Sequence, residues 1–307
     1  MRISTFSYHA DTRNALARAE ADLRRLSRQL SSGKRLTRPS DDPVAVGSII
    51  AARSDLANIL NRQRVLQRAQ TLTGPADSAL DNIAGALRSV REIALGATQP
   101  GLTDEARSSE AEIIRSHRDR IMDEANASVQ KTYLFAGKLS QTKPFEEVAG
   151  AVTYTGGSTG VEVWVAPDRP LEITIPGDRL FNYEDAGGDR PVSEVDSDLF
   201  TVLDDLADAI EAGDDDQITA LTEDLDTLYG HVVEQRGFLG AKVQRIDDAV
   251  ESASDAEVAA RTILSDTEDV DIAQALTELQ HQQLCYQAAL SATAKLAEIP
   301  TLFEIGW

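Results

Sequence analysis

The segment LSSGKRLTRPSDDP, residues 30–43, is predicted to end one helix and to begin the next. Gly33 directly follows a run of helically spaced residues, the position where a glycine commonly ends a helix. A polar residue at 40–42 can cap the next helix, and Pro43 suits its first turn. The segment therefore predicts two helices joined by a short turn.

The helix before this turn has a narrow apolar seam. Between residues 11 and 31 apolar side chains recur at heptad spacing, while arginines and acids fill the other positions. A seam this narrow is typical of a helix that packs against a partner helix. The seam residues are Leu16, Ala19, Leu23, Leu26 and Leu30.

Helical periodicity continues on both sides of a central region. Helices are predicted at about 43–72, 76–98 and 104–130, with Gly74-Pro75 expected to separate the first two. Helix returns near residue 198, and heptad spacing is sustained over 216–252, which suits a rod better than a globule. The last helix repeats this spacing at Ile272, Leu276, Leu279, Gln283, Tyr286, Leu290, Thr293 and Ala297.

The period changes to two between about residues 132 and 183. Val161, Val163 and Val165 alternate with polar residues and Trp164, which is typical of a strand with one buried face. The glycines at 156–160 are expected to form a hairpin loop. The fold class predicted is mainly α with a β-rich insert, in which the N- and C-terminal arms form a long coiled-coil-like rod.

Because the insert interrupts one helical unit, the two ends of the chain are expected to lie side by side. Their seams are narrow and hold few bulky groups, so the terminal segments bury too little surface to fold alone. We expect them to be frayed in the free monomer and to become ordered on assembly.

Composition narrows the classes of function. The net charge is −21, which argues against nonspecific nucleic-acid binding. Residues 1–68 hold 13 Lys and Arg against 6 Asp and Glu, and this basic face is expected to meet acidic neighbours. Cys285 is the single cysteine, so no internal disulfide forms. Neither a cleaved signal peptide nor a membrane span is expected.

No catalytic, cofactor or metal site is predicted. The four histidines are scattered, and no Ser/His/Asp or paired-carboxylate arrangement stands out. Asp214-Asp215-Asp216 precedes a helix, where acidic side chains suit the helix dipole better than they suit a calcium site. The sequence therefore favours a protein that assembles over an enzyme.

Several segments resemble the flagellin superfamily. LSSGKRLTRPSDDPVAV (30–46) is similar to its N-terminal signature, and residues 265–296 resemble the matching C-terminal helix. YLFAG (133–137) with TKPF (142–145), and RGFLGA (236–241), are closest to the branch of flagellar hook-associated protein 3, the hook–filament junction proteins. Pro43 is also typical of that branch.

The resemblance implies three domains. Residues 1–45 with 265–307 would form an axial helical domain, frayed in the monomer. Residues 46–135 with 200–264 would form a helical rod, and residues 136–199 a β-rich surface domain. The ending IPTLFEIGW (299–307) departs from the family's usual short ending.

The resemblance also implies a structural role, with no enzymatic activity and no cofactor. The expected partners are a hook-associated protein on the hook side, flagellin on the filament side, neighbouring copies in a ring, and an export chaperone. Export through the flagellar type III apparatus would place the chain outside the cell, without nucleic-acid binding or membrane insertion. The expected assembly interface comprises Leu16, Leu23, Leu26, Leu30, Gly33, Asp41, Asp42, Pro43, Leu276, Leu279, Tyr286 and Leu290.

Three alternatives stay open. A flagellin would build the filament itself, although Pro43 and the YLFAG and TKPF segments argue against it. A cytosolic coiled-coil scaffold would show similar heptads but would have no use for unstable ends or a β insert. An enzyme with its site in the insert would need a convergent set of His, Cys or carboxylate residues, which residues 132–199 lack.

Overall fold

The computed structural model describes residues 5–38, 40–99, 101–148, 150–166, 169–184, 190–192 and 194–297. Contacts divide the chain into two compact units, Met1–Ile59 with Asp255–Trp307 and Leu60–Ser254. The dividing line falls inside the two longest helices, α2 (Pro43–Ala97) and α6 (Asp215–Glu268). The division into three domains stays a prediction, since its boundaries are not the ones that contacts define.

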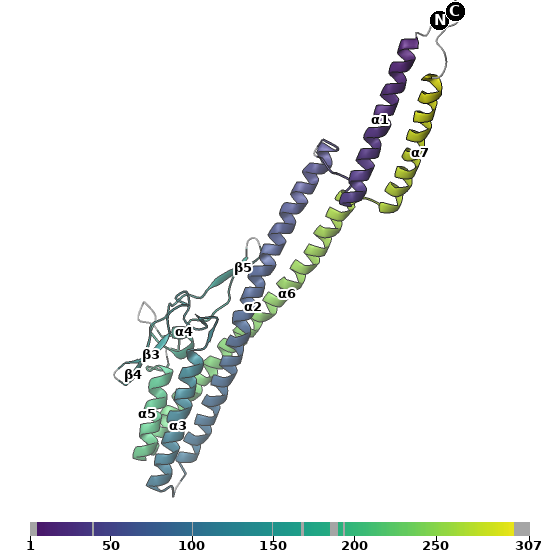
Figure 1. Cartoon of the computed structure of the whole chain (residues 1–307). Coiled ribbons are helices and arrows are strands. Elements are labelled where there is room, and N and C mark those ends of the chain that lie inside the picture. Colours follow the sequence, from purple (N-terminus) through teal and green to yellow (C-terminus); the bar gives the residue numbers. More distant parts are fainter. Residues whose placement is uncertain are drawn as a thin grey trace, which may run out of the picture. The chain divides into compact units, whose positions relative to one another are not determined.

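The first unit is built from helices that are far apart in the sequence. Its α1 (Thr5–Ser32) and α7 (Ile272–Ala297) lie side by side, drawn in purple and yellow in Figure 1. The start of α2 and the end of α6 complete the unit. The expectation that the two arms of the chain lie together is confirmed for these helices.

The second unit holds the apolar core. Parts of α2 and α6 surround it with α3 (Asp104–Ala125) and α5 (Leu199–Ala212), and α3 and α5 pack directly against each other. Each helix turns a regularly spaced apolar face inward, as its 3.6-residue period requires. The larger fully buried side chains of these helices include Leu80, Ile83, Leu87, Ile114, Ile121 and Phe200.

Helix starts follow local capping chemistry. The Thr103 side chain accepts a hydrogen bond from the Ala106 amide and caps α3. The Asp214 carboxylate accepts from the Gln217 amide at the start of α6. The interpretation of the 214–216 acidic run as a helix cap is therefore confirmed.

The predicted break at Gly74-Pro75 was wrong. α2 is one helix of 55 residues with Pro75 inside it. A proline forfeits one helical hydrogen bond, because it has no N–H to donate to the carbonyl four residues earlier. The helix continues because apolar side chains on both sides of Pro75 are buried, with Leu66 and Ala69 before it and Ala76 and Leu80 after it.

The insert consists of three separate two-stranded antiparallel ladders. The strands are β1 (Ser128–Val129), β2 (Thr132–Tyr133), β3 (Phe145–Val148), β4 (Ala151–Tyr154), β5 (Glu162–Ala166) and β6 (Arg169–Glu172), and a short helix α4 (Gly177–Phe181) follows. β3 pairs with β4 and β5 with β6, so the glycines at 156–160 join two hairpins. The expectation that they form a hairpin loop was wrong, because this loop bonds to residues 136–138 instead.

Two features fix the insert onto the helices. Val161, Val163 and Val165 pack against a small buried cluster that includes Leu66 and Ile246, while Trp164 is 58% exposed, so the predicted alternation is confirmed. Deeper in the unit, the Phe145 ring contacts four other aromatic rings with centroids 5.1–5.7 Å away. These rings belong to Tyr154, Phe181, Tyr183 and Phe200.

Among the described residues, one helix is long and apolar enough by composition to cross a membrane, namely α2. The sequence analysis expected no such segment. A single helix of this kind is weak evidence for a membrane span, because helices of soluble proteins pass the same test. Its exposed apolar residues include Val44 and Ile50, which lie in the first unit.

Candidate assembly site

The turn between α1 and α2 is built as its sequence predicts. Gly33 has φ +70°, a left-handed conformation that glycine adopts without strain. The Asp42 carboxylate accepts from the amides of Val44 (3.2 Å) and Ala45 (3.0 Å), and α2 begins at Pro43. Asp42 is therefore the helix cap among the three polar residues that the sequence offered.

Asp41 bonds to the residues that precede it and does not cap α2. Its Oδ2 accepts hydrogen bonds from the amides of Arg38 (2.9 Å) and Thr37 (3.2 Å), and from the Thr37 hydroxyl (3.3 Å). The Arg38 amide favours the charged carboxylate most, and it lowers the pKa of Asp41 below the ordinary value of 3.8. Asp41 thus ties residues 37 and 38 to its own position at the start of the next segment.

Two connecting segments pair with each other at this turn. The Arg35 amide donates to the Glu268 carbonyl (2.7 Å), and the Val270 amide donates to the Gly33 carbonyl (3.0 Å). Between them Lys34 and Asp269 form an isolated antiparallel bridge. We call residues 33–35 and 267–270 the clip, because they fasten the α1–α2 connection to the α6–α7 connection.

A buried carboxylate reinforces the clip. The Glu268 side chain is 6% exposed, and its Oε1 accepts from Lys34 Nζ and from Arg53 Nη2, the latter at 2.5 Å. The Lys34 and Arg53 side chains are 43% and 55% exposed, so the carboxylate is the buried member of this group. It needs such partners because burying an unpaired charge is costly. Glu268 therefore ties together the clip, the beginning of α2 and the end of α6.

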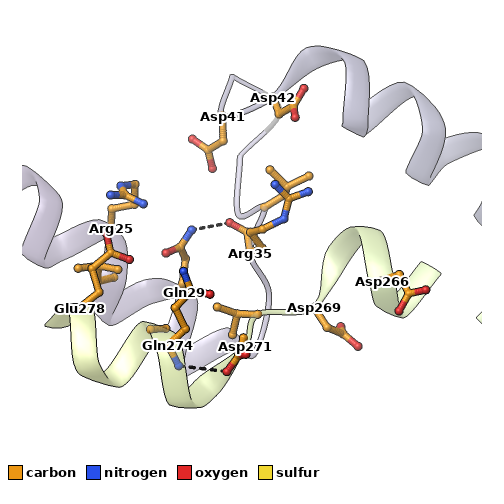
Figure 2. Close-up of a pocket in the computed structure, with 14 residues that line it drawn as sticks. Arg25, Gln29, Arg35, Asp41, Asp42, Asp266, Asp269, Asp271, Gln274 and Glu278 are labelled. Carbon is orange, nitrogen blue, oxygen red and sulfur yellow. Dashed lines mark hydrogen bonds between the residues drawn. The ribbon is translucent and has the colours of Figure 1, made fainter. Parts of the chain in front are cut away.

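Beside the clip lies an open pocket of about 670 Å³ (Figure 2). Six carboxylates and two arginines line it, and most of these acids already accept hydrogen bonds from nearby residues of the chain. Asp271, for example, accepts from the amides of Ala273 and Gln274 at the start of α7. Gln29 points across the pocket and donates to the Arg35 carbonyl at 2.6 Å, as Figure 2 shows. The pocket is lined by Arg25, Leu26, Gln29, Arg35, Leu36, Asp41, Asp42, Asp266, Asp269, Val270, Asp271, Gln274, Ala275 and Glu278.

The α1 seam faces inward as the heptad spacing predicts. Leu26 is 2% exposed, and Leu16, Ala19, Leu23 and Leu30 are half-buried, while most of the positions between them are exposed. Leu23 also lines a second groove with Leu279 of α7. These leucines are therefore held against α7 within one chain.

The predicted register of α7 was wrong at four of its positions. Leu276 is 47% exposed and Leu290 is 42% exposed, and Ile272 and Gln283 are exposed as well. The less exposed positions are instead Ala275, Leu279, Gln282, Tyr286, Ala289 and Thr293, again at heptad spacing. Small or polar residues occupy four of these six positions, and Leu279 and Tyr286 occupy the other two.

The first unit has almost no apolar interior. Both clusters of contacting buried apolar residues in the described part of the chain lie between residues 66 and 253. Among the described residues of the first unit, buried apolar side chains are limited to Leu26, Ile49 and Ala275. Large apolar residues of the same unit lie exposed, namely Val44, Ile50, Val258, Ile263, Ile272, Leu276, Leu284 and Leu290.

The structure gathers only some of the predicted interface residues at one place. Leu26, Asp41 and Asp42 line the pocket, and Gly33 belongs to the clip beside it. Leu16, Leu23, Leu30, Leu279 and Tyr286 lie half-buried along the α1–α7 pair, while Pro43, Leu276 and Leu290 are exposed. Whether neighbouring subunits contact these residues stays a prediction.

Sequence analysis missed the residues that tie the site together. Glu268, Lys34 and Arg53 carry no periodic signal, and the two ends of the clip are separated by 234 positions in the chain. It also overlooked that His281 and Cys285 stand four residues apart on α7, with Sγ 3.8 Å from Nδ1. Among the described residues, no group of three or more His, Cys, Asp or Glu could hold a metal ion.

A second charged cluster lies in the second unit. The Arg118 side chain is buried and donates to Asp119 (3.1 Å), Asp204 (3.2 Å) and Glu147 (3.4 Å). These acids come from α3, α5 and β3 respectively. Burial raises the pKa of Asp204 although the Arg118 charge opposes it. The cluster braces two helices against a hairpin.

Comparison with known proteins places the chain in a family. It matches the bacterial flagellin N-terminal helical region over residues 3–140 and the bacterial flagellin C-terminal helical region over residues 222–302. The two matched regions together cover more than half of the chain. The chain therefore belongs to the flagellin family.

Within that family the relatives differ in similarity. Flagellar hook-associated protein 3 of Escherichia coli strain K12 is 27% identical over 320 residues, covering 99% of both chains. Flagellin of Listeria monocytogenes serovar 1/2a is 21% identical over 305 residues, covering 98% of both. The crystal structure of FlgL from Xanthomonas campestris shares the fold, with a TM-score of 0.60 and 18% identity over 69% of this chain and 98% of that one.

Proposed function

We propose that this chain is a structural adaptor at the junction between hook and filament of a bacterial flagellum, where it templates flagellin assembly. One observation carries the proposal: the first unit has a firmly built clip but almost no apolar core of its own. Higher identity to a hook-associated protein than to a flagellin supports the junction role over that of filament subunit.

The exposed apolar residues of the first unit are the surface that neighbours would cover. Burying a Leu or Ile side chain fully contributes about 1.5–3 kcal/mol. Leu276, Leu290 and Ile272 are 42–63% exposed, so covering them in a lattice would contribute part of that amount each and favour assembly. On the same helix, seam positions would then contact the other helix of the pair, and outward positions would contact neighbouring subunits.

The partners follow from this role. Neighbouring copies would form a ring, with another hook-associated protein on the hook side and flagellin on the filament side, and an export chaperone would hold the chain before secretion. The protein would act outside the cell by mechanical contact, with no enzymatic activity, no cofactor, no nucleic acid and no insertion into the membrane. The apolar surface of α2 near Val44 and Ile50 would be covered by protein.

Seeded assembly tests the proposal directly. Purified chain is mixed with bare hooks that carry the other hook-associated protein, and separately with sheared filament seeds, and both are viewed by electron microscopy. A short cap of added subunits on hooks, extended only when flagellin is supplied, is the expected result. Growth of long filaments from the chain alone would identify a flagellin, and no association with either would remove the flagellar role.

A further inference from the structure

Burial along the α1–α7 pair declines with distance from the clip. Leu26 and Ala275 are 2% and 4% exposed, and the Gln29 side chain beside them is also buried. Further along the pair, Leu23 and Leu279 are only half-buried, as is Tyr286. Among residues 13–38 and 194–294, no set of hydrogen bonds comparable to the clip joins α1 to α7 elsewhere along the pair.

The seam itself is weak by composition. Gln282, Ala289 and Thr293 occupy inward positions of α7, and Ala19 occupies one of α1. Small and polar residues at such positions lower the stability of a helix pair. Two isolated helices of 28 and 26 residues with this seam would face a costly first contact, because nucleation fixes several residues before packing rewards them.

The clip removes that cost at one end. Its two backbone hydrogen bonds, which form the antiparallel bridge at Lys34 and Asp269, hold the C-terminal end of α1 beside the N-terminal end of α7. Arg35 adds a further bond from its guanidinium to the Thr267 carbonyl at 3.0 Å. Once these ends are fixed, each further turn of the pair has only local entropy to overcome.

From this arrangement we infer that the clip is the nucleus from which α1 and α7 zip together, and that Glu268 is the residue that closes it. The side chain of Glu268 is the buried group that joins Lys34 of the clip to Arg53 of α2. The pair then opens from its free ends and stays joined at the clip. This inference concerns the free monomer and does not depend on the proposed function.

Hydrogen exchange of the full-length monomer, followed by mass spectrometry, tests the inference. Wild-type amides are expected to be most protected at 26–35 and 268–279, with protection falling toward 5–16 and 286–297. Glu268→Gln keeps the shape of the side chain and removes its charge. It is expected to lower protection along both helices by about tenfold or more, because charge-assisted bonds are the stronger ones.

A matched control comes from the same helix. Asp266→Asn removes an acid that lines the pocket but lies outside the Lys34–Arg53 contacts, and it should leave protection of both helices unchanged. Protection of α3 and α5 should not change in either variant. Unchanged protection in Glu268→Gln, or a loss confined to residues 266–270, would overturn the inference.

A covalent clip gives an independent test. Partners in an antiparallel bridge have Cα atoms about 4.5–5.5 Å apart, within the range that a disulfide spans. Lys34→Cys with Asp269→Cys is introduced together with Glu268→Gln and Cys285→Ser, and the oxidised and reduced forms of this one protein are compared. Oxidation should restore protection along both helices. If the oxidised form stays as unprotected as the reduced form, the clip is not the nucleus.

Discussion

The two units of this chain satisfy their apolar residues in different ways. The second unit gathers apolar faces of α2, α3, α5 and α6 around one core, into which the aromatic cluster at Phe145 is built. The first unit buries little more than Leu26, Ile49 and Ala275 and holds its helices by a clip of hydrogen bonds and one buried carboxylate. A core stabilises a unit by itself, whereas a clip fixes geometry and leaves surface for others.

This difference separates a unit that has its own apolar core from a unit whose apolar faces stay open. Apolar burial grows with the number of layers around a core, and the second unit has several. A pair of helices has one shared seam, and its opposite faces stay open to solvent unless another chain covers them. Substitutions that affect one unit and leave the other unchanged therefore test this difference.

The largest effect is expected for Leu26→Asp in the first unit. A carboxylate here would replace the buried apolar side chain of the seam by a charge, beside a pocket that holds six acids and two arginines, so the α1–α7 pair should separate and incorporation on hooks should be lost. Electron microscopy of hook decoration measures this, and hydrogen exchange should show α3 and α5 unchanged. Ala21→Asp, at an exposed position of the same helix outside both grooves, is the matched control and should incorporate normally. Normal incorporation of the Leu26→Asp chain would remove the seam from the assembly site.

Phe145→Ala should produce the converse result. It removes a ring that contacts four others in the core, and such truncations cost about 3–5 kcal/mol. Urea unfolding should show the loss in the second unit, while exchange at the clip stays as in wild type. Val148→Ala in the same strand, where the side chain is exposed, should change stability by less than about 0.5 kcal/mol. A loss of clip protection equal to that of the core would show that the two units unfold as one.

Gly137→Ala should destabilise the insert by about 2 kcal/mol or more, since it combines strain with a collision. Gly137 has φ +57°, and an added Cβ would lie 2.2 Å from the Gly157 carbonyl oxygen and 2.7 Å from that of Thr159. Gly157→Ala makes only ordinary contacts, at 3.5 Å and beyond, and serves as the control. Thermal unfolding of both variants checks the expectation. Equal melting temperatures would mean that the 155–160 loop moves aside freely.

Local chemistry explains what the sequence predicted well. The turn at residues 30–43 depends on a left-handed glycine, a capping Asp42 and a proline at the first helical position, and all three act within a few residues of one another. The period-two pattern at Val161, Val163 and Val165 likewise reports the local alternation of a strand. The mainly α fold with a β-rich insert could therefore be predicted.

The predictions that were wrong concern positions where packing between residues far apart in the chain overrides local sequence preference. Pro75 is a helix breaker by itself, but buried neighbours on both sides carry α2 through it. On α7, apolar spacing placed Leu276 and Leu290 in the seam, whereas the less exposed positions beside them are Ala275 and Ala289. The clip joins residues that no local pattern connects, so Glu268 could not be singled out from the sequence.

The smallest effects expected are opposite responses of the two units to acid. For Asp41 the folded pKa is lowered, chiefly by the Arg38 amide, so its stabilisation is present above the ordinary value of 3.8 and lost as pH falls through the folded pKa. For Asp204 burial raises the folded pKa, so its contribution is fully present below 3.8 and lost as pH rises through the folded value. Acid should therefore weaken the hydrogen bonds of residues 37 and 38 to Asp41, whereas protonation of Asp204 should stabilise the second unit.

Asn variants isolate the two carboxylates, because each keeps its shape and no longer titrates. Between about pH 6 and pH 3, Asp41→Asn should flatten the pH dependence of exchange at residues 37–42. Asp204→Asn should change the pH dependence of urea unfolding in the other direction, by at most about 1 kcal/mol, because the side chain is partly exposed and faces Arg118, Glu147 and Asp208. Shifts of the same sign in both variants would show that the turn at Asp41 and the second unit hold their acids in the same way, and the contrast between the units would then rest on apolar burial alone.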